Sequence, residues 1–366
     1  MATHAIETFR AGHVCIVRVR DRDGAEGWGQ TAPYNADITE DCLHRMVAPW
    51  ALGREADDVE AVVRLALDRN YKFTGSFLYR AVGGIDTALW DLRAKRAGKT
   101  VCELFGGTPG PQPCYASSMR RDNTPEQETA RMVDLVNRCG FRAVKIKIGP
   151  RLGRDDDAAG AEIRTRALVP MIRKALPANV QIFADANGSY APDRAIEVGH
   201  WLADHGISQY EEPCPHTDIT GTAKVTAALT GIITVTGGEQ DYLPAIWDLM
   251  TSLPAVHVIQ PDVMYNGGIC TTLAVAKLAA QRGIKVLPHA ANHSMLQVFT
   301  QHLLRALPNA DAFMEYSIED TDWTKDLYTP APQIINGAMP FSPAAGWGIT
   351  PDPQWLETAT RRETLA

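Results

Sequence analysis

The sequence predicts an α/β fold, a parallel (β/α) barrel that follows a smaller α+β unit. Eight short apolar segments alternate with longer amphipathic stretches between residues 112 and 325. A hairpin pattern and several helical stretches precede them, and no long helical stretch follows the eighth segment. The alternation is typical of repeated βα units, and the missing last helix favours a closed barrel over an open sheet.

The composition is that of a globular protein and excludes several classes of function. Of the 366 residues, 45% are hydrophobic and 22% are charged, which is enough for a large core. With 36 Lys and Arg against 43 Asp and Glu, the formal net charge is -7, and the absence of a basic block argues against nucleic acid or membrane partners. The seven cysteines are scattered, and no signal peptide or membrane span is recognisable. We therefore expect a cytoplasmic protein that acts on a small molecule.

Residues 1–111 are predicted to form the α+β unit. Residues 14–19 alternate as a strand, and the D-R-D-G turn that follows is typical of a hairpin. From about residue 40 to 105 the pattern is helical. It is clearest where Ile85, Leu89 and Leu92 recur at helical spacing before Gly98, a residue suited to ending a helix.

Residues 112–325 are predicted to form the barrel, and residues 326–366 a covering segment that is not a domain of its own. A Gly- and Pro-rich stretch at 106–113 separates the barrel from the first unit. The predicted strands are 114–117, 143–148, 180–184, 209–211, 233–236, 256–260, 285–287 and 313–315.

Ionisable residues end most of these strands, and this regularity points to the site. Six of them recur at intervals of 23 to 28 residues, once per βα unit: Asp185, Glu211, Glu239, Asp262, His289 and Glu315. Barrel enzymes carry their chemistry at the carboxyl ends of the strands, so these side chains should converge. Three neighbouring carboxylates, Asp185, Glu211 and Glu239, repel one another unless a cation lies between them, and oxygen ligands suit Mg²⁺. Helix capping is the alternative, and it explains one acid better than three in consecutive units.

The segment R-A-V-K-I-K-I-G places two lysines on one face of a strand. Alternation sends Val144 and Ile146 to one side and Lys145 and Lys147 to the other. Because the apolar side should pack on helices, the lysines should point into the barrel mouth; a solvated edge strand is the alternative. Two adjacent ammonium groups lower each other's pKa, which would let one lysine act as a base.

His289 and Asp262 end neighbouring predicted strands. A carboxylate beside an imidazole fixes the tautomer of the ring and supports its protonated state. His293, four positions further on, competes for this role, but only His289 lies at the strand end. Glu212, next to Glu211, is expected to point to the opposite side of its strand and to be structural.

Together these residues resemble the enolase superfamily, in its mandelate racemase and acid-sugar dehydratase branch, across nearly the whole chain. The resemblance rests on I-D-T-A-L-W-D-L-R-A-K-R-A-G-K-T-V-C-E-L-F-G-G at 85–107 and on the late S-P-A-A-G-W-G-I. Between them K-I-K, D-A-N, E-E-P, G-G-E, P-D and P-H follow in the order of the family. A lysine at the end of the sixth strand would instead indicate the muconate-cycloisomerase branch.

The resemblance implies a fold and a set of roles. The fold is a modified TIM barrel, (β/α)7β, under an N-terminal α+β capping domain that the C-terminal segment completes, in a homo-oligomer that is a dimer or an octamer. The implied Mg²⁺ ligands are Asp185, Glu211 and Glu239. The implied catalytic residues are Lys147 as base with Lys145 assisting, the His289 and Asp262 dyad on the opposite face, and Glu315 on the substrate carboxylate or enolate oxygen. Asn187, in the D-A-N motif, is a predicted substrate contact.

The chain departs from the family pattern at two places. Most of the first strand and the long flap after it are expected to be missing, so that residues 27–35 would have to cover the site. Tyr34 and Asn35 in that segment are predicted substrate contacts, and Lys72 and Arg80 are further candidates, although surface solvation explains each of the four equally well. Gln240 stands where racemase-like members often carry Asn.

The predicted reaction begins with loss of a proton alpha to a carboxylate, which requires stabilisation of the enediolate that forms. Dehydration of a sugar acid, an aldonate or an aldarate, to a 2-keto-3-deoxy acid is the leading hypothesis. Either Lys147 or His289 takes the proton, and His289 protonates the departing hydroxyl group. The alternatives are a racemase or epimerase of a 2-hydroxy acid, a Schiff-base aldolase on Lys147, and a non-catalytic metal-dependent protein that binds sugar acids.

Overall fold

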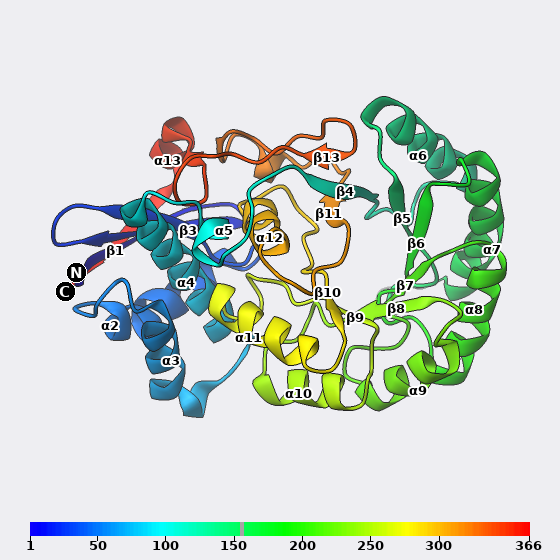
Figure 1. The fold of residues 1–366 in the computed structure, drawn as a ribbon, viewed down its shortest axis with the longest axis horizontal. Coiled ribbons are helices and arrows are strands. Elements are labelled where there is room, and N and C mark those ends of the chain that lie inside the picture. The colour runs from blue at the N-terminus through cyan, green and yellow to red at the C-terminus, as the bar shows by residue number, and fades with distance from the viewer. Residues whose placement is uncertain (154–156) are drawn as a thin grey trace.

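The structure is a computed structural model that describes residues 1–153 and 157–366 of the chain. An antiparallel sheet with its helices forms one side of the molecule and a barrel of parallel strands forms the other (Figure 1). Both termini lie at the outer end of the antiparallel sheet (Figure 1), because the last strand of the chain pairs with the first.

The cap is built on a four-stranded sheet in the order β15-β1-β2-β3. The strands β1 (Thr3–Ala11), β2 (Val14–Asp21) and β3 (Glu26–Gln30) form an antiparallel meander, and β15 (Thr360–Leu365) adds to its edge. The helices and helical turns that follow are α1 (Ala36–Cys42), η1 (Leu43–Val47), α2 (Ala48–Ala51), α3 (Val59–Arg69), η2 (Tyr71–Phe73), α4 (Ser76–Ala97) and α5 (Val101–Leu104). The helix predicted around residues 85–97 is confirmed, and Gly98 ends it in the left-handed conformation, at φ 62°.

The expectation that most of the first strand is missing is wrong. Strand β1 has nine residues, and polar side chains hide its pattern in the sequence. Its Glu7 is fully buried, and Arg18, Arg20 and Arg361 from the two neighbouring strands neutralise the charge, with Arg18 Nε 2.8 Å from Glu7 Oε2. The connection from β1 to β2 has only two residues, so the chain has no long flap at this point.

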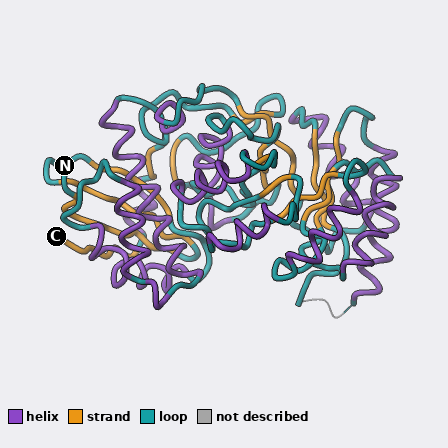
Figure 2. The backbone as a smooth tube through the Cα atoms, turned by 60° about the horizontal axis from the view of Figure 1, so that its bottom comes forward, coloured by secondary structure: helices purple, strands orange, loops and turns teal. Residues whose placement is uncertain are grey.

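The predicted barrel is confirmed. Its strands are β4 (Gln112–Ser117), β5 (Ala143–Lys147), β6 (Gln181–Asp185), β7 (Gln209–Glu211), β8 (Thr234–Gly237), β9 (Val258–Ile259), β10 (Lys285–Val286) and β11 (Met314–Ser317), and each overlaps a predicted strand. The helices between them are α6 (Pro125–Cys139), α7 (Ala158–Ala175), α8 (Pro192–Asp204), α9 (Ile219–Leu229), α10 (Pro244–Ser252), α11 (Ile269–Ala280) and α12 (Leu296–Leu304). These helices, purple in Figure 2, lie outside the strands, which gives the (β/α)7β arrangement.

Parallel pairing runs through the strands in the order β10-β9-β8-β7-β6-β5-β4-β11. The ends of this path meet just before β11, where Val286 N donates to Asn309 O at 2.9 Å and Asp311 N donates to Val286 O at 2.8 Å. Aromatic rings fill the interior: Tyr115 lies 5.2 Å from Phe183 between ring centroids. The barrel is therefore a packed core with two separate ends.

The C-terminal segment runs from the barrel back to the cap. It contains η3 (Asp322–Thr324), β12 (Tyr328–Thr329), β13 (Ala338–Met339), β14 (Thr350–Pro351) and α13 (Pro353–Thr358) before β15. Strand β13 pairs with β4 of the barrel, and β15 pairs with β1 of the cap. This one segment thus hydrogen-bonds to both parts of the molecule.

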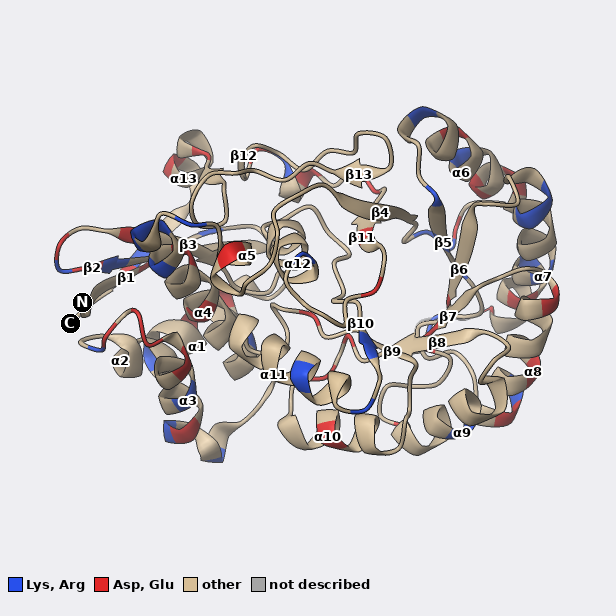
Figure 3. Ribbon diagram, in the orientation of Figure 1, with Lys and Arg blue, Asp and Glu red and all other residues tan. Residues whose placement is uncertain are grey.

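Charged residues of both signs lie along the outer helices α6, α7 and α8 (Figure 3), and several of them form ion pairs with one another. Among the described residues, no helix is both long and apolar enough to cross a membrane.

The contact between β3 and α4 gives a prediction for Gly27. A Cβ atom at this position would clash with Ala88 O and would lie 2.5 Å from Leu92 N, both backbone atoms of α4. We expect Gly27→Ala to lower the free energy of unfolding by about 3 kcal/mol, because the strand and the helix would have to separate. Gly75→Ala is the control, since nothing lies within 4 Å of its added Cβ. Urea unfolding of both variants checks this, and equal stabilities would contradict it.

Candidate active site

Strand register brings the predicted site residues together at the carboxyl ends of the barrel strands. Lys147 at the end of β5 is paired in register with Asp185 at the end of β6, and Asp185 is paired with Glu211 at the end of β7. Neighbouring parallel strands therefore present their last side chains at one level, as the sequence predicts.

Lys145 lies at the centre of this group. Its Nζ is 2.6 Å from Glu211 Oε1, 2.7 Å from Glu315 Oε1 and 3.7 Å from Asp185 Oδ2, and its side chain is 1% exposed. Burial alone lowers the pKa of Lys145, but Glu211 and Glu315 outweigh burial and raise it well above its ordinary value. In this arrangement, with Glu211 and Glu315 as its partners, Lys145 is held as an ammonium ion, and the expected lowering of the lysine pKa values beside a metal ion stays a prediction.

Lys147 forms an ion pair with Asp185 beside this centre. Asp185 is fully buried, and although burial raises its pKa, the charges of Lys147 and Lys145 lower it well below its ordinary value. Its Oδ1 accepts from the backbone N of Asn187 at 2.8 Å, and the Asn187 side chain accepts from Arg121 Nη2 at 3.0 Å. Asn187 thus holds Asp185 in place from the following turn, and its predicted contact with the substrate stays a prediction.

His289 and Asp262 form a hydrogen-bonded pair. His289 Nδ1 donates to Asp262 Oδ2 at 2.7 Å, and its Nε2 lies 3.3 Å from Glu239 Oε2 and 3.8 Å from Glu315 Oε2. The backbone N–H groups of Met264 and Tyr265 donate to Asp262 Oδ1 and fix that carboxylate. Burial lowers the pKa of His289, but Glu239, the Asp262 hydrogen bond and Glu315 outweigh it and raise the pKa to about 10.

Glu315 joins the lysine side of the site to the histidine side. It contacts Lys145 and His289, and it also accepts from Ser117 Oγ at 2.7 Å and from Ala290 N at 3.0 Å. Burial raises its pKa, but Lys145 and His289 outweigh burial and lower the pKa to about 2. Glu315 is therefore a carboxylate that accepts hydrogen bonds and not a donor.

Glu212 belongs to the same cluster, contrary to the sequence-based expectation. The residue follows β7 with a left-handed backbone, at φ 43°, which turns its side chain away from strand alternation. Its Oε2 accepts from Asn187 Nδ2 at 3.4 Å. Burial, Glu239 and Asp185 raise its pKa well above the ordinary value. Gln260, whose Nε2 donates to Glu211 Oε2 at 2.9 Å, is a further neighbour that the sequence analysis missed.

The donor set suits a divalent cation. Asp185 and Glu211 end β6 and β7, Glu239 follows β8 by two residues, and all three offer only oxygen ligands, as Mg²⁺ prefers. Burial, Asp185 and Glu315 raise the pKa of Glu211 to about 7 against the opposing charge of Lys145, which indicates an excess of negative charge here. The carboxylates now face Lys145, Lys147 and His289, and in the described part of the chain no three acidic, His or Cys side chains are already arranged around one point. Metal binding would exchange some of these ion pairs for metal contacts.

The predicted cap contacts lie in different places. Tyr34 is 50% exposed and packs on His13 and Trp323, with ring centroids 5.0 and 5.7 Å away, while Asn35 precedes α1. Lys72 is exposed and lies over the ring of Tyr71. Arg80 contacts Tyr265 in the loop after β9: its Cζ is 3.8 Å from the ring centroid of Tyr265.

His293 does not compete with His289 for the dyad. Its Nε2 lies 2.6 Å from Ser317 O, and its ring lies against Tyr316. Burial lowers its pKa, so that this ring is a neutral part of the packing.

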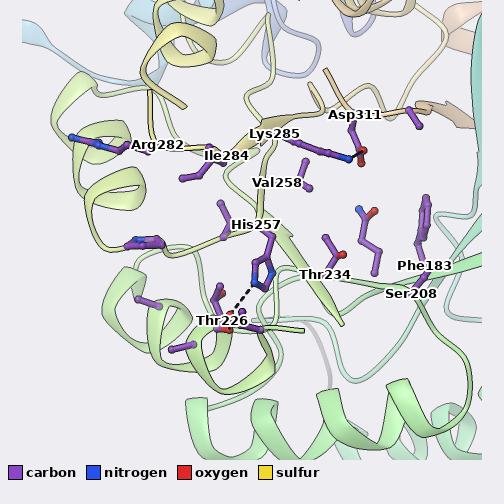
Figure 4. Close-up of a pocket in the computed structure, with 18 of the residues that line it drawn as sticks. Phe183, Ser208, Thr226, Thr234, His257, Val258, Arg282, Ile284, Lys285 and Asp311 are labelled. Atoms are coloured by element: carbon purple, nitrogen blue, oxygen red, sulfur yellow. Dashed lines mark hydrogen bonds and ion pairs between the residues drawn. The ribbon is translucent and has the colours of Figure 1, made fainter. Parts of the chain in front are cut away.

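A large cavity lies at the other end of the barrel. It has a volume of about 800 Å³ and is lined by residues from the amino ends of the strands (Figure 4). Its polar groups pair with neighbours: Lys285 Nζ lies 3.2 Å from Asp311 Oδ1 (Figure 4), and His257 Nε2 lies 3.1 Å from Thr230 Oγ1. The size of a cavity therefore does not point to the candidate active site in this barrel. The cluster of charged side chains at the carboxyl ends of the strands does.

Comparisons with known protein families match both parts of the chain. Residues 2–106 match the family model described as the N-terminal domain of mandelate racemase and muconate lactonizing enzyme, and residues 127–355 match the model described as enolase C-terminal domain-like.

Characterised relatives and solved structures cover nearly the whole chain. Arabinonate dehydratase of Saccharolobus solfataricus is 25% identical over 96% of this chain and 90% of the relative, and L-talarate/galactarate dehydratase of Salmonella typhimurium is 28% identical over 92% and 80%. A crystal structure from Roseobacter denitrificans, provisionally named a racemase, is 46% identical with a TM-score of 0.96 over 100% of both chains. A magnesium complex of a mandelate racemase/muconate lactonizing protein from Paracoccus denitrificans is 25% identical with a TM-score of 0.89 over 100% of this chain and 98% of the other.

The dyad gives a prediction for Asp262→Asn. Because the pKa of His289 is raised from 6.5 to about 10, the protonated ring stabilises the fold fully below pH 6.5, and this contribution is lost as the pH rises through about 10. Asp262→Asn should lower the pKa of His289. The difference in free energy of unfolding between wild type and this variant should therefore become smaller between pH 6.5 and 10. NMR titration of the ring in EDTA-treated protein checks the pKa, with His293 as an internal control. An unchanged His289 pKa would contradict the prediction.

Proposed function

The chain belongs to the mandelate racemase and muconate lactonizing enzyme family of the enolase superfamily, and from this premise we propose that it dehydrates a sugar acid to a 2-keto-3-deoxy acid. One observation carries the proposal: Lys147 and the His289 and Asp262 pair approach one group of carboxylates from different sides of the barrel. Lys147 ends β5 and His289 follows β10, and four strands lie between β5 and β10 in the sheet.

Elimination of water needs a base and an acid at neighbouring carbons. Lys147 removes the C2 proton, and the electron pair left on C2 delocalises into the carboxylate as an enediolate. The pair then returns to form the C2–C3 double bond while the bond from C3 to its hydroxyl group breaks. His289 donates a proton to that hydroxyl group, which leaves as water, and the resulting enol tautomerises to the 2-keto acid. Because Nδ1 of His289 is hydrogen-bonded to Asp262, the proton on Nε2 points toward the carboxylates at the centre of the site.

The remaining residues stabilise the enediolate and hold the acid and the base. Lys145 keeps its charge in a buried place, where a hydrogen bond to a developing oxyanion is strong. Glu315 positions both Lys145 and His289, because it contacts each of them. Asp185, Glu211 and Glu239 would hold the Mg²⁺ ion, which when bound supplies positive charge to the substrate carboxylate. The two dehydratases and the magnesium complex among the similar proteins support these assignments.

A racemase or epimerase of a 2-hydroxy acid is the second candidate. The structure from Roseobacter denitrificans favours it, since it shares 46% identity with this chain and carries a provisional racemase name. Lys147 and His289 would then take and return the C2 proton on opposite faces, and no hydroxyl group would leave.

A panel of aldonates and aldarates with Mg²⁺ tests the dehydratase proposal. We expect 2-keto acid from at least one member, and no product from any member with a folded protein would refute dehydration. In ²H₂O, deuterium in the recovered substrate without loss of water would instead identify the racemase reaction.

Variants of the two proton-transfer residues test the site. Lys147→Ala and His289→Asn should each lower kcat for dehydration by about 100-fold or more while Mg²⁺ still binds, because each removes a proton-transfer group and no proposed metal ligand. Lys285→Ala at the opposite end of the barrel and His293→Asn are matched controls and should stay near wild type. Calorimetric Mg²⁺ titration and a 2-keto acid assay give the two readouts. Full activity of both site variants would show that the acid and the base lie elsewhere.

A further inference from the structure

Arg80 differs from the other basic residues of its helix. Arg93 of α4 pairs with Glu60, Lys95 pairs with Asp91, and Arg96 pairs with Asp21 and Asp57. Within residues 1–153 and 157–366, Arg80 forms no ion pair, although its side chain is half-buried and lies against the ring of Tyr265. A partly desolvated guanidinium group without a carboxylate partner has its hydrogen-bond donors available to a ligand.

The cap holds Arg80 rigidly at the barrel mouth. Six residues further along α4, Asp86 accepts from Ile269 N at 2.5 Å and from Cys270 N at 3.2 Å, so that it caps α11 of the barrel. At Gly83, an added Cβ would lie 3.4 Å from Gly268 N, which shows how closely α4 approaches the loop after β9. Arg80 therefore sits on a helix docked to the barrel and not on a mobile flap.

Tyr265 connects Arg80 to the catalytic dyad. Its backbone N donates to Asp262 Oδ1 at 3.1 Å, and its ring centroid lies 6.2 Å from that of His289. Together the two ring distances place the Arg80 guanidinium carbon within about 10 Å of the His289 ring, while an extended six-carbon diacid separates its carboxyl carbons by roughly 6 Å. A substrate with its C3 hydroxyl at His289 can therefore reach Arg80 with its far end.

We propose that Arg80 and Tyr265 form a subsite for the distal carboxylate of the substrate, so that the enzyme prefers an aldarate to the corresponding aldonate. This inference rests on the proposed function and narrows its substrate class. The Tyr265 ring covers one face of the guanidinium group and leaves its in-plane N–H donors free for a two-pronged contact with a carboxylate. An aldonate ends in a neutral hydroxyl group, which cannot neutralise this half-buried charge.

Tyr265 contributes a hydrogen-bond donor to the same subsite. Burial and Asp262 raise the pKa of its phenol above the ordinary value, against the opposing charge of Arg80, so the hydroxyl group keeps its proton. Among the described residues this hydroxyl group has no hydrogen-bond partner, and it is not among the buried unpaired polar atoms. It is thus accessible to a ligand.

Matched substrate pairs test the subsite. Each pair is an aldarate and the aldonate of the same configuration, in which the distal carboxylate is replaced by a CH₂OH group. Wild type should prefer the aldarate by at least about 10-fold in kcat/KM, and Arg80→Met should lower kcat/KM for the aldarate by about 30-fold with little change for the aldonate. For the aldarate, kcat/KM of Arg80→Lys should lie between those of wild type and Arg80→Met, because lysine keeps the charge and lacks the planar guanidinium group. Arg93→Met is the control on the same helix and should match wild type.

The outcomes separate this inference from the proposed function. If Arg80→Met lowers kcat/KM equally for both members of a pair, or if wild type does not prefer the aldarate, the subsite is refuted while dehydration stands. If wild type turns over neither member of any pair, dehydration is refuted, and the Kd of each member from calorimetry then decides the subsite. A tighter aldarate Kd that Arg80→Met abolishes supports it, and equal Kd values overturn it.

Discussion

The buried ammonium group of Lys145 is the interaction on which the site depends. Taking one charge out of water costs several kcal/mol, and a buried ion is stable only with partners of opposite sign in good geometry. Lys145 has three such partners, which come from β6, β7 and β11, and the face of Tyr115 lies 5.5 Å from its Nζ. These contacts can form only if the strands keep their order and register. The strand pairing that stabilises this charge thus also fixes the positions of the proposed acid and base.

Helix α4 joins the cap to the barrel, and the same helix carries Arg80, the residue of the proposed subsite. One side of α4 packs on β3 so closely that glycines are required at the contact, and another side binds the loop after β9 through Asp86. Asp91 on the same helix accepts from Trp28 N of the cap sheet and from Trp347 N of the C-terminal segment. Side chains at the start of α4 are therefore as fixed relative to the barrel as the strand ends are.

The sequence reveals those site residues whose position follows from strand periodicity. Asp185, Glu211, Asp262 and His289 could be found because each ends or closely follows a strand that apolar runs mark clearly. Glu212 could not, because its left-handed backbone departs from strand alternation. Strand β1 was hidden by the charge of Glu7, which three arginines distant in sequence neutralise. The pKa of Lys145 likewise depends on three acids from other strands, and no local sequence pattern predicts which residues these are.

Partnerless polar groups identify ligand sites here better than empty volume does. The large cavity at the amino ends of the strands has charges, but Lys285, Asp311 and His257 already satisfy one another or their neighbours. A ligand entering there would have to break those contacts before gaining its own. At the other end, Arg80 has a ring on one face and no counter-charge within the described residues, so a carboxylate would gain a strong contact without breaking one. The difference in what must be broken favours the carboxyl ends of the strands, and not the large cavity, as the place of the proposed substrate site.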